Sequence, residues 1–241
     1  MLMDWLEQAK KAARTEECLS LEYGPLPGRG SVVMLAPHPD DPDTCAVFQK
    51  MLQLGGWEIW WVVLTSGWSG VRDEFAGTDK EAKTACRWQE QLDSCHLFGL
   101  NEDWYEFLGL PETDDGELAD NLASYRHFAS DLNELAPDIV ILPWGKDTNA
   151  THRLTYEWFM RWRADRPVTA FFAEDPKSLD FTPHLEIVFD EETAAWKASL
   201  LECHRSQTDR NLATRGITFS ERILSVNRRE TGFVERYRIM G

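Results

Sequence analysis

Short apolar stretches rich in β-branched residues alternate along this chain with longer segments of helical character. The apolar stretches are typical of buried strands, and we expect strands at 31–37, 57–65, 105–108, 138–143, 168–174 and 185–190. Helices are expected between and after them, at 43–54, 79–98, 118–135, 151–164 and 191–203. Because neighbouring parallel strands are joined through helices, the alternation predicts an α/β domain with a Rossmann-like, mostly parallel sheet flanked by helices.

The length of the chain suits a single domain of this class. Its 241 residues fit one α/β domain, and no obvious linker interrupts them. We expect an amphipathic helix within residues 1–24, followed by a connector rich in proline and glycine at 24–30. No apolar run approaches the ~20 residues that cross a bilayer, and the N-terminus lacks the basic and apolar regions of a signal peptide. The sequence therefore predicts neither a membrane span nor a signal peptide.

Charge and cysteine content narrow the function classes. The chain has 25 Lys and Arg residues against 41 Asp and Glu residues, a formal net charge of −16. Nucleic-acid backbones and anionic membranes bind clustered Lys and Arg, so neither is an expected partner. The five cysteines are scattered and include no C-x-x-C pair, which favours reduced thiols in the cytoplasm over a disulfide framework. The 11 tryptophans are compatible with core packing, a homo-oligomer interface or stacking on carbohydrate.

The strand order of such a sheet predicts where a ligand binds. In a Rossmann-like order, the strands expected at 31–37 and 138–143 lie side by side. Ligands of these folds bind at the carboxyl ends of the strands, at the point where the strand order reverses. We therefore expect the site just after Pro37 and just after Pro143.

Residues 38–43, directly after the first of these strands, read HPDDPD. An imidazole and a carboxylate with open coordination positions suit Zn²⁺ or another divalent ion. A second carboxylate beside the first allows one to bind metal while the other deprotonates water. The alternative is that Asp40, Asp41 or Asp43 caps the following helix and that His38 is a polar strand end.

His152 follows the other strand, where a helix is expected to start. With His38 and Asp41 it would complete a three-ligand set with room for water, which is the pattern of a catalytic rather than a structural zinc. The alternative is a solvent-facing histidine at a helix N-terminus. Because two candidate half-sites fall at the two expected loops, the metal site is the favoured interpretation.

Several further motifs occur in register along the chain. They are APHPDD at 36–41, LTSG at 64–67, R-x-x-E-Q at 87–91, an acidic residue at Glu112, D-x-x-x-x-H-R at 147–153 and K…H-x-S-Q at 197–207. In these motifs the sequence resembles the PIG-L/LmbE-like deacetylases, a zinc-dependent family that removes N-acetyl groups from amino sugars such as N-acetylglucosamine and from sugar conjugates. The resemblance covers 31–207, which leaves 1–30 as an N-terminal helix and connector and 208–241 as a C-terminal segment.

The resemblance implies a role for each residue of the two half-sites. His38, Asp41 and His152 would bind the metal, and Asp40 would be the general base that activates the metal-bound water. That water would attack the amide carbonyl, with acetate and a free amine as products. Zn²⁺ is the expected cofactor, with Fe²⁺ or another divalent ion as the alternative.

The sequence departs from the family at three positions. Asn149 stands where the family has a histidine that assists the oxyanion and the leaving group. Asparagine donates a hydrogen bond but supplies no proton near neutral pH, so Asn149 stays a catalytic candidate while another group, such as Asp40, would protonate the amine. Pro42 and Trp68 replace acidic residues of the family, which implies changed substrate contacts.

Three residues are candidates for substrate binding: Arg72, Glu112 and Trp68. Arg72 would contact a sugar or phosphate, or else pair with acids at the surface. Glu112 would bind substrate hydroxyls, or else be a solvated loop acid. Arg87 and Glu90 lie one helical turn apart and are interpreted as a structural ion pair, and the segment around His204 is interpreted as packing beneath the site.

The expected function is metal-dependent removal of an N-acetyl or other N-acyl group from a small-molecule amino sugar or sugar conjugate. The first alternative is a catalytically weakened or non-enzymatic protein of the same fold that retains metal and binds sugar. The second is another amide or ester hydrolase on the same scaffold. Asn149 is the residue that discriminates between an enzyme and a lapsed enzyme.

Overall fold

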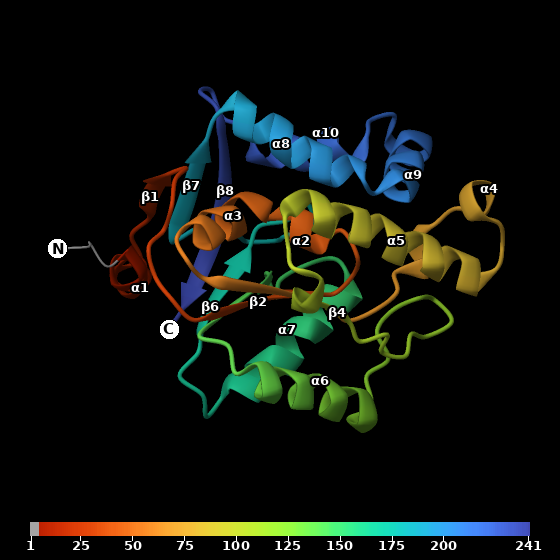
Figure 1. Cartoon of the computed structure of the whole chain (residues 1–241), viewed down its shortest axis with the longest axis horizontal. Coiled ribbons are helices and arrows are strands. Elements are labelled where there is room, and N and C mark those ends of the chain that lie inside the picture. The colour runs from red at the N-terminus through yellow and green to blue at the C-terminus, as the bar shows by residue number, and fades with distance from the viewer. Residues whose placement is uncertain (1–4) are drawn as a thin grey trace.

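Eight strands form one sheet across residues 5–241, the part of the chain that this computed structural model describes (Figure 1). They are β1 Leu19–Glu22, β2 Ser31–Ala36, β3 Glu58–Val63, β4 Tyr105–Phe107, β5 Ile139–Pro143, β6 Thr169–Ala173, β7 Leu185–Phe189 and β8 Phe233–Met240. Their order in the sheet is β1-β7-β8-β6-β5-β2-β3-β4. Neighbours run parallel except at β8, which is antiparallel to both β6 and β7. The predicted fold class, a mostly parallel Rossmann-like sheet, is confirmed.

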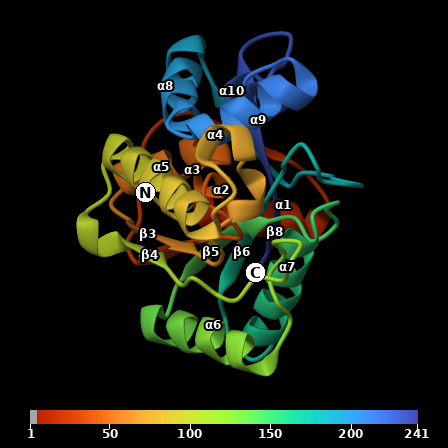
Figure 2. The ribbon, with the colours of Figure 1, turned by 90° about the vertical axis from the view of Figure 1, so that its right-hand side faces the viewer.

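Helices cover both faces of this sheet (Figure 1 and Figure 2). They are α1 Trp5–Thr15, α2 Asp41–Thr44, α3 Ala46–Leu54, α4 Asp73–Ala76, α5 Lys80–Phe98, α6 Leu122–Leu135, α7 Ala150–Arg163, α8 Glu191–Glu202, α9 Arg205–Arg215 and α10 Phe219–Asn227. Two 3-10 turns, η1 Trp68–Gly70 and η2 Glu102–Trp104, complete the elements. α3, α5 and α8 lie on one face and α6 and α7 on the other, while α9 and α10 lie beside α8 (Figure 1). Within the described residues, no helix is long and apolar enough to cross a membrane.

The core is divided by the sheet into two apolar clusters. Successive side chains of a strand point to opposite faces. On β2, Val32 and Met34 therefore pack with the α3 and α5 side, and Val33 and Leu35 pack with the α6 and α7 side. Both sets are fully buried, which explains why the strand is a continuous apolar run rather than an alternating one.

The predicted strands and helices form with small shifts at their ends, and one expectation at the N-terminus is wrong. Residues 19–22 form strand β1, paired with β7 from Leu19 opposite Leu185, and do not continue the expected helix. The helix ends because Glu16 adopts a left-handed backbone conformation with φ 56°. The alternating burial of 19–22 is the period-two pattern of a strand. Residues 1–4 of the expected helix lie outside the described residues.

A buried polar cluster joins the end of the chain to the start of α3. The Glu235 carboxylate on β8 accepts hydrogen bonds from the backbone N–H groups of Val47 and Phe48, at 3.0 and 2.9 Å. These groups are among the N-terminal donors of α3 that have no partner within the helix. Lys197 Nζ donates to Glu235 at 2.7 Å and to the Thr44 carbonyl oxygen at 2.6 Å. The cluster therefore holds α2 and α3, and with them the loop that follows β2.

Candidate metal centre and its cleft

The first half of the site is the turn between β2 and α2. The backbone N–H of His38 donates to Asp41 Oδ2 at 2.8 Å, which closes the turn. Asp40 has a left-handed backbone with φ 102°, a conformation that costs a non-glycine residue about 1–2 kcal/mol. Although Asp40 occupies the N-cap position of α2, its side chain makes no capping hydrogen bond. The capping role considered for Asp40 is therefore not what its carboxylate does here.

Two side chains of α5 hold Asp40 in this conformation. Gln91 Oε1 accepts the Asp40 backbone N–H at 2.9 Å. Arg87, which is 2% exposed, donates from Nη2 to Asp40 Oδ1 at 2.8 Å and also to the Pro39 carbonyl oxygen. Arg87 lies 3.9 Å from Glu90, so the expected ion pair is present, but the shorter contact is to Asp40. Arg87 is thus a positioning residue for the Asp40 carboxylate.

The second half of the site is the start of α7, beyond the carboxyl end of β5. β2 and β5 are neighbours in parallel, as predicted, with Val33 opposite Val140. Asn149 is the N-cap of α7, and its side-chain oxygen accepts the His152 backbone N–H at 3.1 Å. The side-chain oxygen of Asn149 is therefore occupied, and its NH₂ group is the part that remains to face the cleft.

His38, Asp41 and His152 converge on one point, as predicted for the three-ligand set. One ligand atom from each lies within 4.8 Å of the others. Asp41 bridges the two rings, with Oδ2 3.3 Å from His38 Nδ1 and Oδ1 3.4 Å from His152 Nε2. His152 is completely buried, and its Nε2 has no hydrogen-bond partner within the described part of the chain. An orphaned buried nitrogen that faces a carboxylate is the arrangement that a cation would complete.

Charge at this point is balanced by proton binding when no cation is present. Burial opposes a charge on His152, but the facing carboxylates of Asp41 and Asp147 outweigh it and raise its pKa to about 10. Burial likewise opposes the charge on Asp41, yet His152 and His38 hold its pKa well below its usual range. In the absence of a metal, the positive charge of the His152 imidazolium compensates the carboxylates of Asp41 and Asp147. A divalent cation would supply that charge in its place.

Asp147 orients the His152 ring from behind. Its Oδ2 lies 3.1 Å from His152 Nδ1, and its Oδ1 accepts the Asn149 backbone N–H at 2.6 Å. When His152 is neutral, as a metal ligand must be, a proton on Nδ1 would leave the Nε2 lone pair directed at the metal position beside Asp41, which is how outer carboxylates fix the tautomer of ligating histidines. Asp175 also lies near Asp147 and His152, and one ligand atom from each of the three lies within 4.8 Å of the others. Burial raises the pKa of Asp175.

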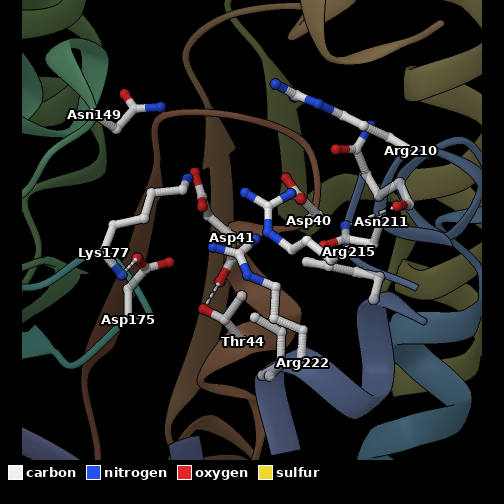
Figure 3. A pocket seen from close by; sticks show the side chains of 13 residues that line it. Asp40, Asp41, Thr44, Asn149, Asp175, Lys177, Arg210, Asn211, Arg215 and Arg222 are labelled. Atoms are coloured by element: carbon white, nitrogen blue, oxygen red, sulfur yellow. Dashed lines mark hydrogen bonds between the residues drawn. The ribbon is translucent and has the colours of Figure 1, made fainter. Parts of the chain in front are cut away.

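Two adjoining cavities open beside the candidate ligands His38 and Asp41, and we call them together the cleft. Figure 3 shows the first of them, which is lined by Asp41. Asp40, Asp41 and Asn149 line both cavities, together with Lys177 from the segment after β6 and Arg210 from α9. One cavity, of about 130 Å³, continues beneath α9 and α10, and the other, of about 260 Å³, continues toward residues 115–117. The predicted catalytic residues Asp40 and Asn149 thus share a cleft with the candidate metal ligands.

The three residues predicted to bind substrate are not brought into this cleft. Arg72 forms ion pairs with Asp209 at 3.1 Å and with Glu74 at 3.2 Å. Glu112 accepts hydrogen bonds from the hydroxyl and backbone N–H of Ser66. Trp68 lies in η1 with Lys80 Nζ 5.0 Å from its ring. Within the described residues, none of the three lines either cavity, and their role in binding stays a prediction.

His204 and Ser206 pack behind the site, as interpreted, whereas Gln207 of the same segment lines both cavities. His204 Nε2 lies 2.6 Å from Asp43 Oδ2, and Ser94 donates to the other oxygen of that carboxylate at 2.6 Å. Glu90 accepts the backbone N–H and the hydroxyl of Ser206, both at 2.7 Å. Asp43 and Glu90 therefore tie α2 and α5 to the start of α9.

Sequence reasoning missed two kinds of residue in this site. Asp147 and Gln91 stand inside the motifs at 147–153 and 87–91, and their place in those motifs was the available signal. Lys177 and Arg210 carry no local signal, because they enter the cleft from distant segments through the tertiary fold.

Comparison with known proteins agrees with this geometry. The family described as PIG-L, GlcNAc-PI de-N-acetylase, matches residues 33–162. No curated protein matched the chain in sequence. Three solved structures illustrate the fold. The N,N'-diacetylchitobiose deacetylase of Pyrococcus horikoshii has a TM-score of 0.70 and 18% identity, over 88% of this chain and 84% of that one.

Of the other two structures, one is named as a hydratase and the other as a deacetylase. The 4-carboxy-2-hydroxymuconate hydratase GalB of Pseudomonas putida has a TM-score of 0.65 and 14% identity, over 88% of this chain and 96% of that one. The zinc-inhibited form of the teicoplanin deacetylase Orf2 has a TM-score of 0.65 and 14% identity, over 87% and 97%. At these identities the likeness concerns the fold.

Proposed function

The chain belongs to the PIG-L family, and we propose that it is a metal-dependent hydrolase that removes an N-acetyl or other N-acyl group from an amino sugar or sugar conjugate. The observation that carries the proposal is the convergence of His38, Asp41 and His152, with the orphaned His152 Nε2 at their centre and the Asp40 carboxylate beside them. Two histidines and one carboxylate with open positions suit Zn²⁺, and the same set suits Fe²⁺.

Each residue of the cleft then has a definite task. A divalent cation held by His38, Asp41 and His152 would polarise the amide carbonyl and acidify water. Asp40 accepts the proton of the attacking water and returns it to the leaving amine, and Arg87 holds its carboxylate in place. The Asn149 NH₂ group donates a hydrogen bond to the developing oxyanion. Asp147 keeps His152 in the tautomer that exposes Nε2.

Metal content is the first test. We expect about one Zn²⁺ or Fe²⁺ per chain in protein purified without chelator, lost in His152→Ala and kept in Asp40→Asn. Amine release from N-acetylglucosamine conjugates should be lost in His152→Ala and reduced by about 10²–10⁴-fold in Asp40→Asn. Protein that binds no metal after addition of Zn²⁺ would exclude the mechanism. Product analysis by mass spectrometry separates loss of an acyl group from addition of water, the reaction in the name of the hydratase neighbour.

The alternative, a metal-retaining sugar-binding protein without activity, is tested at Asn149. Asn149→Asp keeps an acceptor for the His152 backbone N–H and removes the NH₂ donor. If Asn149 stabilises the oxyanion, this variant loses about 10²–10³-fold in kcat with the metal retained. If the chain is a lapsed enzyme, the wild type and Asn149→Asp are equally inactive, and Asn149→His raises amine release by orders of magnitude. We propose the cytoplasm as its location, because all five cysteines are free thiols.

A further inference from the structure

Four cationic side chains surround the cavity beneath α9 and α10 (Figure 3). Lys177 comes from the segment after β6, Arg210 and Arg215 from α9, and Arg222 from the first turns of α10. Lys177 is distant in sequence from the three arginines, which lie on the successive helices α9 and α10, and the fold brings the four charges together. The concentration of cations is notable in a chain whose net charge is −16, since acids outnumber bases 41 to 25.

These cations differ from three arginines elsewhere in the chain in what they contact. Arg72, Arg87 and Arg236 each have a carboxylate oxygen within 3.2 Å. In the part of the chain that the structure describes, the side chains of Lys177 and Arg222 form no hydrogen bond or ion pair. Arg210 likewise has no partner there, and Arg215 donates only to its neighbour Thr214. Within the described residues, no carboxylate oxygen lies within ion-pair distance of these four side chains, although Asp40, Asp41 and Asp175 line the same cavity.

The cluster carries an energetic penalty that its surroundings offset only in part. Burial, together with like charges such as Arg215, lowers the pKa of Arg210 and of Arg222, and the attraction of Asp40, joined at Arg222 by that of Asp175, opposes this without cancelling it. The start of a helix, where Arg222 lies, is also the end at which the helix dipole disfavours a cation. Three acids line the same cavity: Asp40, Asp41 and Asp175. Asp41 and Asp175 belong to the candidate metal clusters around His152, where a bound divalent cation would compensate their charge, and Asp40 is paired with Arg87. With the metal present, the arginines are left in excess.

We propose that the substrate carries an oxyanion, a carboxylate or a phosphate, and that this group binds between Arg210, Arg215 and Arg222. The proposal rests on the proposed N-deacylase function for the remainder of the substrate. Guanidinium groups match both oxyanions through paired N–H donors, which makes arginine the side chain suited to this task. The net charge of the chain repels an anion at long range, so an anionic substrate needs local positive charge in order to bind.

The shape of the cleft assigns a direction to the substrate. The metal centre lies where the two cavities meet, since Asp41 lines both. Lys177 and Arg210 line both cavities. The cavity toward residues 115–117 adds Asp115 and Glu117, whose carboxylates accept hydrogen bonds from neutral hydroxyls but repel anions, while the cavity beneath α9 and α10 adds Arg215 and Arg222. The anionic group therefore extends beneath α9 and α10, and the uncharged sugar hydroxyls face the other cavity.

The test compares neutral and anionic probes on metal-loaded protein. The neutral probe is N-acetylglucosamine, and the anionic probes are N-acetylglucosamine 6-phosphate, N-acetylglucosamine 1-phosphate and N-acetylmuramic acid. We expect kcat/KM for at least one anionic probe to exceed that for the neutral probe at least tenfold, and whether a phosphate or the carboxylate is preferred identifies the oxyanion. Arg210→Gln and Arg222→Gln should each reduce kcat/KM for that probe about ten- to hundredfold, and in each variant this loss should exceed the loss for the neutral probe at least tenfold.

A matched control comes from the same helix. Arg205 begins α9, is exposed and lines neither cavity, so Arg205→Gln should leave all four rates unchanged. Equal kcat/KM for neutral and anionic probes, or an equal loss in Arg205→Gln and Arg222→Gln, overturns the oxyanion subsite while leaving the hydrolase intact.

Binding measurements keep the two proposals separate if no probe is hydrolysed. Calorimetric titration of N-acetylglucosamine 6-phosphate and N-acetylmuramic acid into metal-loaded protein needs no turnover. A Kd at least tenfold weaker in Arg222→Gln than in Arg205→Gln supports the oxyanion subsite. If none of the probes is hydrolysed, only the proposed hydrolase function is then rejected. No binding, or the same Kd in both variants, rejects the subsite.

Discussion

Lys197 offers the sharpest test of how the fold supports the site. Its ammonium group is buried and donates three hydrogen bonds, to the Thr44 carbonyl oxygen at 2.6 Å, Asn227 Oδ1 at 2.8 Å and Glu235 Oε1 at 2.7 Å. Lys197→Met keeps most of the side-chain volume and leaves Glu235 as a buried carboxylate without its counter-ion. Removing one partner of a buried pair costs about 3–5 kcal/mol.

The remaining contacts of Glu235 place the expected cost at the lower end of that range. The carboxylate keeps two backbone N–H donors from α3 and the Tyr237 hydroxyl at 2.7 Å. We therefore expect the free energy of unfolding to fall by about 3 kcal/mol, and Tm by about 6–12 °C at this chain length. Urea unfolding followed by tryptophan fluorescence, together with calorimetry, measures both quantities.

A double variant separates the charge from the packing. In Lys197→Met with Glu235→Gln no charge is left buried, so we expect at least half of the lost stability to return. Lys197→Met within 1 kcal/mol of wild type would refute the reasoning, as would a double variant less stable than the single one. Either result would mean that water or a shifted backbone solvates Glu235.

Three further expectations concern single residues. Asp147→Asn weakens the charge-assisted hydrogen bond to His152 and should lower metal affinity about tenfold in a competition titration with a chromophoric chelator; unchanged affinity would contradict the orienting role. Arg87→Met frees the Asp40 carboxylate, so kcat should fall about 10²-fold while metal content stays the same, and loss of both together would point to misfolding instead. Burial and the neighbouring Glu106 raise the pKa of Asp131 to about 7. The native state therefore binds this proton more tightly than the unfolded chain, and the resulting stabilisation, complete below about pH 4, is lost as pH rises through 7. Asp131→Asn should remove that part of the pH dependence. After discounting for solvent screening of this half-buried group, we expect the free energy of unfolding of the variant at pH 8 to exceed that of the wild type by about 1 kcal/mol. Parallel stability curves of the two proteins from pH 5 to 8 would refute this expectation.

The sequence predicted the parts of this molecule that depend on local pattern. The buried run before His38 and the run before position 144 identified two parallel strands, and the switch-point rule then brought His38, Asp41 and His152 together. The strand at 19–22 was missed because four residues at a sheet edge are too few for their alternation to outweigh the preceding helical pattern.

The basic side of the cleft could not be predicted for a different reason. Arg210 and Arg222 lie on α9 and α10, whose placement over the metal centre is determined by tertiary packing against α8 and the sheet. Nothing within a short window of sequence distinguishes them from surface arginines such as Arg205. Only the fold shows that they share a cavity and that no carboxylate of the described residues lies within ion-pair distance of them.

The position of β8 has a consequence for how the chain reaches this structure during synthesis. β8 is the last strand of the sheet to leave the ribosome, yet it lies between β6 and β7 in the interior of the sheet. Until residues 233–240 emerge, β7 and β1 have no neighbour that joins them to the other strands. We propose that 1–30, 31–207 and 208–241 form one unit. The nascent protein would then keep an unpaired sheet edge until β8 is synthesised. A fragment limited to 33–162 lacks β8 and could not complete the sheet.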